Sequence, residues 1–552
     1  MTQRDRAIIA ALSVLLIVLA LAATIPAATG GPLAVASASP SESSEASAAP
    51  PPFYREGVIG SPSSITPLTA RTQADRDLSR LVFSGLVARG SGSSYVPDLA
   101  ASWTVDATGS TWTFKLRPDA QWQDGQPVTA DDVVFTVGLL KDPAYRGALA
   151  NSWREVTVTR IDAETVQFNL ATPIAGFLED ALVGILPRHL LATTAVTDLA
   201  DSTFANDPVG SGPYRLVHWD ATSADLVAVA TNPAPVLAGI ELEFFSDSGT
   251  LADAYRTGTL DAASGLAPTD ALALAGLAGS RLLSYPTTTF TSVALNLRPD
   301  HPELAPAPVR KALLQALDRP AILSNVLAGT GSQADSPIPP SSWAFDAKAS
   351  APVASNPAAA AAALKADGWK KVAAGWEAPK ATAPYALEVD SPDQASNPIA
   401  WGAADLVTSQ WRAFGLKVTH VGLAPADLIT RLGSGTFAAA VVQVNIGLDP
   451  DLYPLFASSQ AITSGANVTG IQNSSLDALL VAARAPGTDS ARRAAYARLE
   501  TALVGNPAML PIFFQNDLVV VDSRVVGATI RSLSDLSDRY WDVLTWRLAD
   551  GR

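Results

Sequence analysis

The sequence predicts a mixed α/β or α+β fold with several sheets. Segments that alternate apolar and polar residues, as half-buried strands do, occur between segments whose apolar residues recur every three or four positions, as on amphipathic helices. No repeat of fixed short period is present, which disfavours a solenoid or a propeller. The 552 residues suffice for about three domains, and the mixed order disfavours a helical bundle or a β-sandwich.

The N-terminal segment is predicted to direct export. Arg4 and Arg6 precede an apolar run over residues 7–25, and a basic stretch before an apolar one is typical of export signals. The run is close to the ~20 residues that cross a bilayer, and an A-x-A cleavage motif follows at residues 34–36. Residues 1–36 are therefore either a cleaved signal or an N-terminal membrane anchor.

Residues 37–52 are rich in Ser, Ala, Glu and Pro, which is typical of a disordered tether. We expect the folded part to begin near Phe53 and to be extracytoplasmic. It would lie on the outer face of the cytoplasmic membrane if the anchor is kept, and be secreted or periplasmic if the signal is cleaved. The chain has no cysteine, which excludes disulfides, thiolate metal sites and a cysteine nucleophile. It also excludes a lipoprotein, because a bacterial lipoprotein carries its lipid on a cysteine.

The charge balance argues against nucleic-acid binding. The chain has 38 Lys+Arg against 52 Asp+Glu, a formal net charge of −14. Proteins that bind DNA or RNA need basic patches that displace counterions from phosphate. No nucleic-acid partner is therefore expected.

The individual elements follow from local pattern. Residues 112–116 alternate as a strand, and Thr129 with Asp132 three positions later forms a capping box that starts a helix. Pro308 starts another helix, with apolar residues at helical spacing, and a further helical stretch ends near Gly329. The remaining predicted elements are helices over 399–414, 476–483 and 491–504 and a strand over 416–421.

Local signals for catalysis or metal binding are missing. The four histidines are each isolated from other ligands, so no preassembled metal site is indicated; they are His189, His218, His301 and His420. The Gly-Ser-Gly runs do not continue into phosphate-binding motifs, and no G-x-S-x-G elbow for a hydrolase serine occurs. We predict no catalytic residues, no metal and no cofactor.

Several longer motifs occur in a defined order. LVFSGLV stands at 81–87, PDLAASW at 97–103, WTFKLRP at 112–118 and WQDGQPVTADDV at 122–133. PVGSGPY follows at 208–214, VRKAL and ALDR at 309–313 and 316–319, SPIPP at 336–340 and DP at 449–450. Together they resemble the signature of family 5 extracellular solute-binding proteins, the peptide/nickel receptors of ABC importers. The resemblance spans most of residues 55–520.

The resemblance implies a two-lobed fold like that of the periplasmic binding proteins, of the large type II class with an extra subdomain. The lobes close by hinge motion around a solute in a cleft. The first lobe is expected at residues 53–283, with the extra subdomain at about 91–204, and the second lobe at 284–504. Residues 505–552 are expected to return to the first lobe.

We expect ligand contacts at Phe290, Trp401, Asn445 and Asp449. Peptide-binding members carry an Asp a few residues before the D-P pair, where it meets the ammonium group of the peptide. Here that stretch reads VNIGL at 444–448 and contains no acid. A buried ammonium without a counter-charge is costly, so free peptides are disfavoured and uncharged or differently oriented solutes gain weight. Asp449 either takes the place of the missing acid or caps the following turn.

The expected function is that of a monomeric, non-enzymatic extracytoplasmic receptor. It would capture a peptide-like or other small organic solute and deliver it to an ABC permease in the cytoplasmic membrane. Two alternatives stay open, a sensor or envelope scaffold that keeps the fold without transport, and a secreted enzyme built on the same fold.

Overall fold

The structure, a computed structural model, describes residues 53–92, 94–147, 149–230 and 233–549. The predicted export segment 1–36 and tether 37–52 lie outside these residues. Within the described ranges, none of the helices is both long and apolar enough to cross a membrane.

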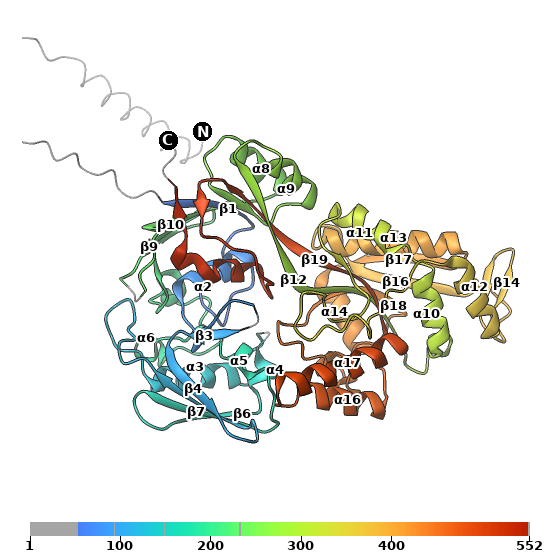
Figure 1. The fold of residues 1–552 in the computed structure, drawn as a ribbon, viewed down its shortest axis with the longest axis horizontal. Coiled ribbons are helices and arrows are strands. Elements are labelled where there is room, and N and C mark those ends of the chain that lie inside the picture. The colour runs from blue at the N-terminus through green and yellow to red at the C-terminus, as the bar shows by residue number, and fades with distance from the viewer. Residues whose placement is uncertain (1–52, 93, 148, 231–232, 550–552) are drawn as a thin grey trace, which may run out of the picture. The chain divides into compact units, whose positions relative to one another are not determined.

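One mixed sheet of eleven strands runs through the described part of the chain (Figure 1). In spatial order its strands are β17 (Lys417–Leu423), β16 (Ala386–Pro392), β18 (Ala439–Asn445), β12 (Ser280–Leu295), β19 (Met509–Asp522), β11 (Ala262–Ser264), β1 (Tyr54–Ile59), β10 (Gly239–Phe245), β9 (Ser223–Ala228) and β8 (Tyr214–Trp219), with β13 (Ser332–Gln333) paired to β19. β16 pairs in parallel with β17 and β18, and β1 in parallel with β10 and β11, whereas β12 and β19 are antiparallel. The predicted mixture of α and β structure is confirmed.

The side chains form separate cores at the two ends of the β12–β19 pair. The first core takes its residues from Tyr54 to Tyr285 and again from Val519 to Trp546. Two further cores take theirs from Phe290 to Phe514. A fourth, smaller core takes residues from Leu251 to Leu274 together with Leu518 and Val520. We call the part around the first and fourth cores the first half and the part around the other two the second half. The register between β12 and β19 shifts between Pro286 and Phe290, where the chain passes from one half to the other.

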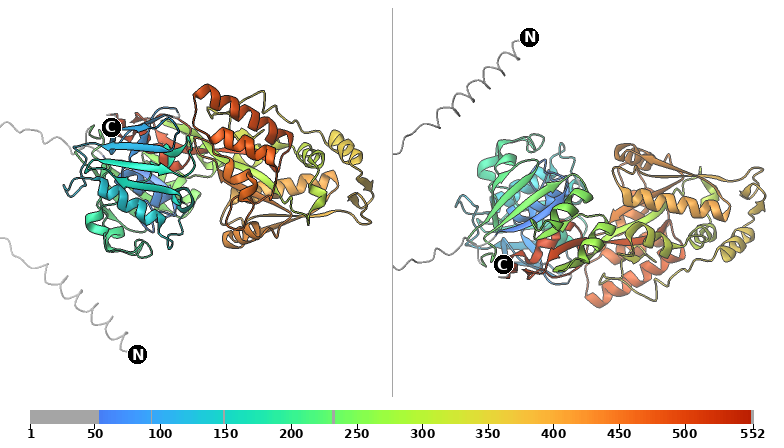
Figure 2. Two further views of the ribbon diagram at one scale, coloured as in Figure 1. Left: turned by 90° about the horizontal axis from the view of Figure 1, so that it is seen from below. Right: turned by 90° about the horizontal axis from the view of Figure 1, so that it is seen from above.

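The two cores of the second half lie on opposite faces of the same strands. Val293 and Leu295 join one core, whereas Ala294 between them joins the other, as the alternation of side chains along a strand requires. Helix α13 (Pro398–Phe414) covers the first face, and helix α17 (Asp489–Gly505) covers the second (Figure 2).

The first half contains a separate four-stranded antiparallel sheet. Its order is β4 (Ala100–Val105), β5 (Thr111–Leu116), β7 (Thr165–Leu170) and β6 (Val156–Arg160). Helix α3 (Ala130–Lys141) packs against β6 and β7. These elements fall within the range 91–204 predicted for an extra subdomain; the borders of that subdomain and of the lobes stay predictions.

The locally predicted elements are present. The backbone N–H of Thr129 donates to Asp132 Oδ2 at 2.8 Å at the start of α3, which confirms the predicted cap. The helix predicted from Pro308 is α10 (Ala307–Gln315), and α11 (Arg319–Leu327) follows it. The helices predicted over 399–414, 476–483 and 491–504 are α13, α16 (Ser474–Arg484) and α17, and the strands over 112–116 and 416–421 are β5 and β17.

The C-terminal segment is tied to the start of the first half by a buried ion network. Arg539, in the 3₁₀ segment η3 (Leu536–Thr545), donates to Glu56 Oε1 at 2.9 Å and to both oxygens of Asp77 at 2.7 Å. Arg539 is 1% exposed, and Glu56 and Asp77 are fully buried. A buried guanidinium is tolerated only when its charge and donors are satisfied in this way.

Candidate functional site

The carboxyl ends of three strands in the second half lie at one edge of the sheet. The parallel strands β16 and β17 end at Pro392 and Leu423, and β18, parallel to β16, ends at Asn445. Helix α13 begins at this edge, where the side chain of Asn397 caps it by accepting from the N–H of Ala400 at 2.9 Å. Ligands of open α/β sheets bind outside the carboxyl ends of parallel strands, so this edge is the candidate site.

Asn445 joins the two halves at this edge. Its Oδ1 accepts from Thr288 Oγ1 at 2.7 Å and from the N–H of Gly447 at 2.8 Å. Its Nδ2 donates to the backbone carbonyl of Ser534, in the segment that η3 anchors to the first half. Asn445 nevertheless remains an exposed residue, so its amide is accessible to a solute.

The carboxylate of Asp449 forms an ion pair with an arginine. Arg492 of α17 donates to its two carboxylate oxygens at 2.9 and 2.6 Å. The following turn is capped by another residue, since the N–H of Tyr453 donates to Asp451 Oδ1 at 3.1 Å. The Asp449 carboxylate thus pairs with Arg492, and its role toward a solute stays a prediction. A β-carbon built on Gly176 of the first half would lie 3.6 Å from the carboxyl carbon of Asp449, which places this pair at the border between the halves.

A group of charged residues surrounds the same border. Ala175 of the first half donates its N–H to the carbonyl of Arg484 at 3.0 Å, and the Arg484 guanidinium pairs with Asp451 at 2.8 Å. Asp180 lies in the short helix α5 (Phe177–Asp180) and forms no ion pair within the described residues. Burial raises the pKa of Asp180 to about 6, and the nearby charges of Glu179 and Asp451 add to the effect.

On the first-half side, Arg89 connects three groups. Its guanidinium, 5% exposed, pairs with Glu179 at 2.8 Å and with Asp538 at 3.1 Å. It also donates to the hydroxyl of Ser534 at 2.5 Å, so it fixes the residue whose carbonyl Asn445 reaches.

Side-chain amides line the edge next to Asn445. Gln443 Oε1 accepts from Asn397 Nδ2 at 2.7 Å, and Gln443 Nε2 donates to Thr291 Oγ1 at 3.0 Å and to Gln515 Oε1 at 3.1 Å. All four residues come from different elements, which is why the sequence did not indicate this network. The alternation of side chains along β18 predicts only that Gln443 and Asn445 lie on the same face of the strand.

Phe290 and Trp401, the other two predicted ligand contacts, differ in how deeply they are buried. Phe290 is fully buried, and its ring lies 5.4 Å from the ring of Phe514. Trp401 is half-buried on the first turn of α13, with its ring 5.5 Å from that of His420. The Oγ of Ser391 lies 2.8 Å from His420 Nε2, and burial lowers the pKa of this histidine. Phe290 lies near the edge because its strand pairs with β18 at Val444, but its side chain is buried. Trp401 is only partly buried, so part of its ring is accessible beside the edge.

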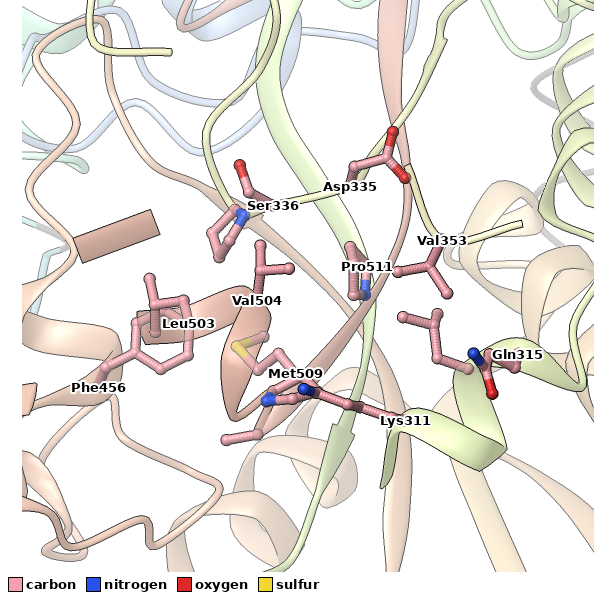
Figure 3. Close-up of a pocket in the computed structure, with 14 residues that line it drawn as sticks. Lys311, Gln315, Asp335, Ser336, Val353, Phe456, Leu503, Val504, Met509 and Pro511 are labelled. Carbon is pink, nitrogen blue, oxygen red and sulfur yellow. The ribbon is translucent and has the colours of Figure 1, made fainter. Parts of the chain in front are cut away.

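Metal ligands are not gathered at this edge. Within the described residues no group of three His, Cys, Asp or Glu side chains could hold a metal ion. A cavity with an apolar lining lies elsewhere in the second half, between α10, α17 and the start of β19 (Figure 3).

Comparison with known proteins identifies relatives over most of the chain. Residues 94–464 match the family model described as bacterial extracellular solute-binding proteins, family 5 middle. Protein XP55 from Streptomyces lividans is 28% identical over 483 residues, 86% of this chain and 85% of that protein. The oligopeptide-binding protein AppA from Bacillus subtilis is 23% identical over 505 residues, 89% of this chain and 91% of AppA.

Solved structures share the fold. The structure of B. subtilis AppA in complex with a nonapeptide has a TM-score of 0.74 at 22% identity and covers 90% of this chain and 99% of AppA. NikZ from Campylobacter jejuni in complex with Ni(L-His) has a TM-score of 0.72 at 23% identity, over 90% and 99% of the two chains. The predicted fold class, that of the two-lobed periplasmic binding proteins, is confirmed.

Proposed function

Because the chain belongs to family 5 of the bacterial extracellular solute-binding proteins, we propose that it is the receptor of an ABC importer. It acts outside the cytoplasm, captures a small organic solute between its two halves and hands the solute to a membrane permease. The names of the relatives support this proposal, since they include an oligopeptide-binding and a nickel-binding protein.

The observation that carries the proposal is the contact of Asn445 with both halves. Asn445 ends a strand of the second half and Thr288 lies where β12 crosses between the halves, whereas Ser534 belongs to the segment tied to the first half. A solute at the carboxyl edge of β16–β18 therefore meets groups from both halves only when they are together. Contacts available only in the closed state shift the population toward closure.

The polar groups at the edge point to the class of solute. The amides of Asn445, Gln443, Asn397 and Gln515 both donate and accept hydrogen bonds, and the carboxylate of Asp449 is already neutralised by Arg492. These groups suit a peptide-like or other small organic solute. Such a solute either has no charge at the position where a peptide would place its ammonium group, or binds in a different orientation. We propose that Asn445 and Trp401 contact the solute directly. Phe290 and Asp449 instead hold the residues of the edge in place without contacting the solute.

The first experiment identifies the solute. The protein is purified from its native host, denatured, and the released small molecules are identified by mass spectrometry. The proposal expects one organic solute at near-equal molar ratio that rebinds to refolded protein and is recovered chemically unaltered after incubation. Conversion of the solute to a product would favour the enzyme, and retention of normal solute uptake in a strain lacking the protein would favour the sensor or scaffold.

A further inference from the structure

The second half contains a cavity that is separate from the candidate site. It has a volume of about 140 Å³ and is formed by α10, the loop at residues 335–337, the end of α17 and the start of β19 (Figure 3). Neither Asn445 nor Asp449 is among its lining residues.

Most of the cavity wall is apolar. Its apolar side chains come from four separate stretches of the chain; they are Leu314, Val353, Phe456, Leu503, Val504, Met509 and Pro511. A protein cavity of about 150 Å³ with such a lining holds one benzene molecule. The available space therefore fits a ring or a short chain of about six carbons and excludes a long acyl chain.

Two polar side chains stand together at one end of this wall. Lys311 and Gln315 are four positions apart on α10, so they project from the same face of the helix. In the described part of the chain, neither the ammonium of Lys311 nor the side-chain amide of Gln315 has a hydrogen-bond or ion-pair partner. Figure 3 shows the Lys311 side chain extended along the cavity toward Met509.

The acidic residue of the lining is at the opposite end. Asp335 lies across the cavity from Lys311 (Figure 3). Its Oδ1 accepts from Arg319 at 2.7 Å and from Gln333 at 2.9 Å, and the Arg319 side chain is 1% exposed. The Asp335 charge is thus compensated, which leaves the Lys311 ammonium as the uncompensated charge of the cavity lining.

We propose that this cavity binds a small monocarboxylate with a compact apolar body, of the size of benzoate. The carboxylate accepts hydrogen bonds from Lys311 Nζ and Gln315 Nε2, and the apolar body fills the space between Leu314, Leu503 and Met509. An apolar cavity alone would take a neutral molecule equally well; the free ammonium at its mouth selects an anion.

The composition of the chain offers a direct probe. It has two methionines, Met1 and Met509, and Met509 is 5% exposed and lines the cavity. In protein labelled with ¹³C at the methionine methyl groups, benzoate should shift the Met509 signal in a saturable way, because a ring current acts on a methyl group in contact with it. Acetate, which has the charge without the body, should leave the signal in place.

Charge and space are tested separately. Lys311→Leu should weaken benzoate about five-fold, the size expected of one partly exposed ion pair, and leave the affinity for neutral benzyl alcohol unchanged. Lys365→Leu, which removes an exposed lysine on helix α12 (Pro357–Ala366) outside the lining, is the matched control and should bind benzoate normally. Val504→Phe should fill the cavity and abolish the Met509 shift.

Three results would overturn the proposal. The first is that the Met509 signal does not shift up to the solubility limit of benzoate. The second is that the unaltered protein binds benzoate and benzyl alcohol with equal affinity, and the third is that Lys311→Leu binds benzoate as tightly as the unaltered protein. The solute identified for the candidate site, added at saturation, should leave the benzoate titration unchanged; direct displacement of benzoate from Met509 by that solute would also overturn it. Because the readout is at Met509, the outcome does not depend on whether the protein serves an importer.

Discussion

Arg492 donates to both carboxylate oxygens of Asp449, at 2.9 and 2.6 Å, and the two side chains are only 13% and 15% exposed. The guanidinium also lies over the Trp343 ring, 4.6 Å from its centre. Asp449 is the first acid after the strand end at Asn445, and it is already neutralised. An ammonium group of a solute would have to displace a guanidinium that is held on two sides, which disfavours amine-bearing solutes at this position.

The Arg492–Asp449 pair should contribute to stability as a unit. Arg492→Gln and Asp449→Asn should each lower the free energy of unfolding by about 2 kcal/mol, because each leaves a largely buried charge without its partner. The double variant should lose less than the sum, with a coupling of about 1–3 kcal/mol. Urea denaturation of the four proteins measures the coupling. Arg256→Gln, which removes an exposed pair with Asp253, should have no measurable cost, and strict additivity of the two changes would refute the coupling.

Asn445→Ala should weaken solute binding. The substitution removes the hydrogen bonds with Thr288 and Ser534 and the second amide N–H, which is left for the solute. Loss of about 1–2 kcal/mol corresponds to about a ten-fold weaker affinity. Isothermal titration with the solute identified by mass spectrometry measures it. Asn325→Ala, at an exposed helical residue, is the control; equal affinities of Asn445→Ala and the unaltered protein would remove Asn445 from the site.

Gly109→Ala should hinder closure of the two halves. A β-carbon at Gly109 of the first half would lie 2.2 Å from Cγ of Pro486 in the second half, so the hairpin turn would have to move away. We expect solute affinity to fall about ten-fold, in line with an overpacking cost of about 1–3 kcal/mol. Dyes on two introduced cysteines, one in each half, report the distance between the halves, since the chain has no cysteine of its own.

Gly125→Ala is the matched control for this experiment. Gly109 and Gly125 both have positive φ angles, +75° and +86°, so both variants bear similar backbone strain. A β-carbon at Gly125 meets no atom within 4 Å. A similar loss of affinity in both variants would mean that strain, and not the contact with Pro486, is responsible.

The fold should lose stability as the pH rises through the range in which Asp180 titrates. Burial raises its pKa from 3.8 to about 6. A carboxyl group whose pKa is higher in the folded state stabilises the fold fully only below its unfolded pKa, and this contribution is lost as the pH rises through the folded pKa. Asp180→Asn should therefore match the unaltered protein near pH 4 and exceed it by about 2 kcal/mol at pH 8, after allowance for partial exposure.

Denaturation by urea at pH 4, 6 and 8 tests this prediction. Asp207→Asn, at an exposed residue of the same half, should show the pH profile of the unaltered protein. If Asp180→Asn has the same profile as well, the carboxyl of Asp180 is not destabilised by its burial.

Local sequence predicted the elements but not the contacts between them. The cap at Thr129 and Asp132, three positions apart, and the end of α13 at Gly415, with φ +99°, depend on neighbouring residues. The contact of Asn445 with Ser534 spans 89 positions and that of Arg492 with Asp449 spans 43, so no local pattern encodes them.

The burial of Phe290 is a second property that local sequence could not predict. It was predicted as a ligand contact, and in the structure it pairs with Val444 across the strands. Which face of the strand carries its side chain depends on the register between β12 and β19, and that register shifts beside Phe290. The missing acid at 444–448 was visible in the sequence, whereas the arginine that occupies Asp449 was not.

The Arg539 network has a consequence for biosynthesis. The hydrogen bond between Arg539 and Glu56 joins residues 483 positions apart, and the arginine is near the end of the 552-residue chain. While the ribosome is still translating, Glu56 and Asp77 lack the cation that allows their burial. The nascent polypeptide therefore cannot complete its earliest-made core until residue 539 has been translated and has left the ribosome.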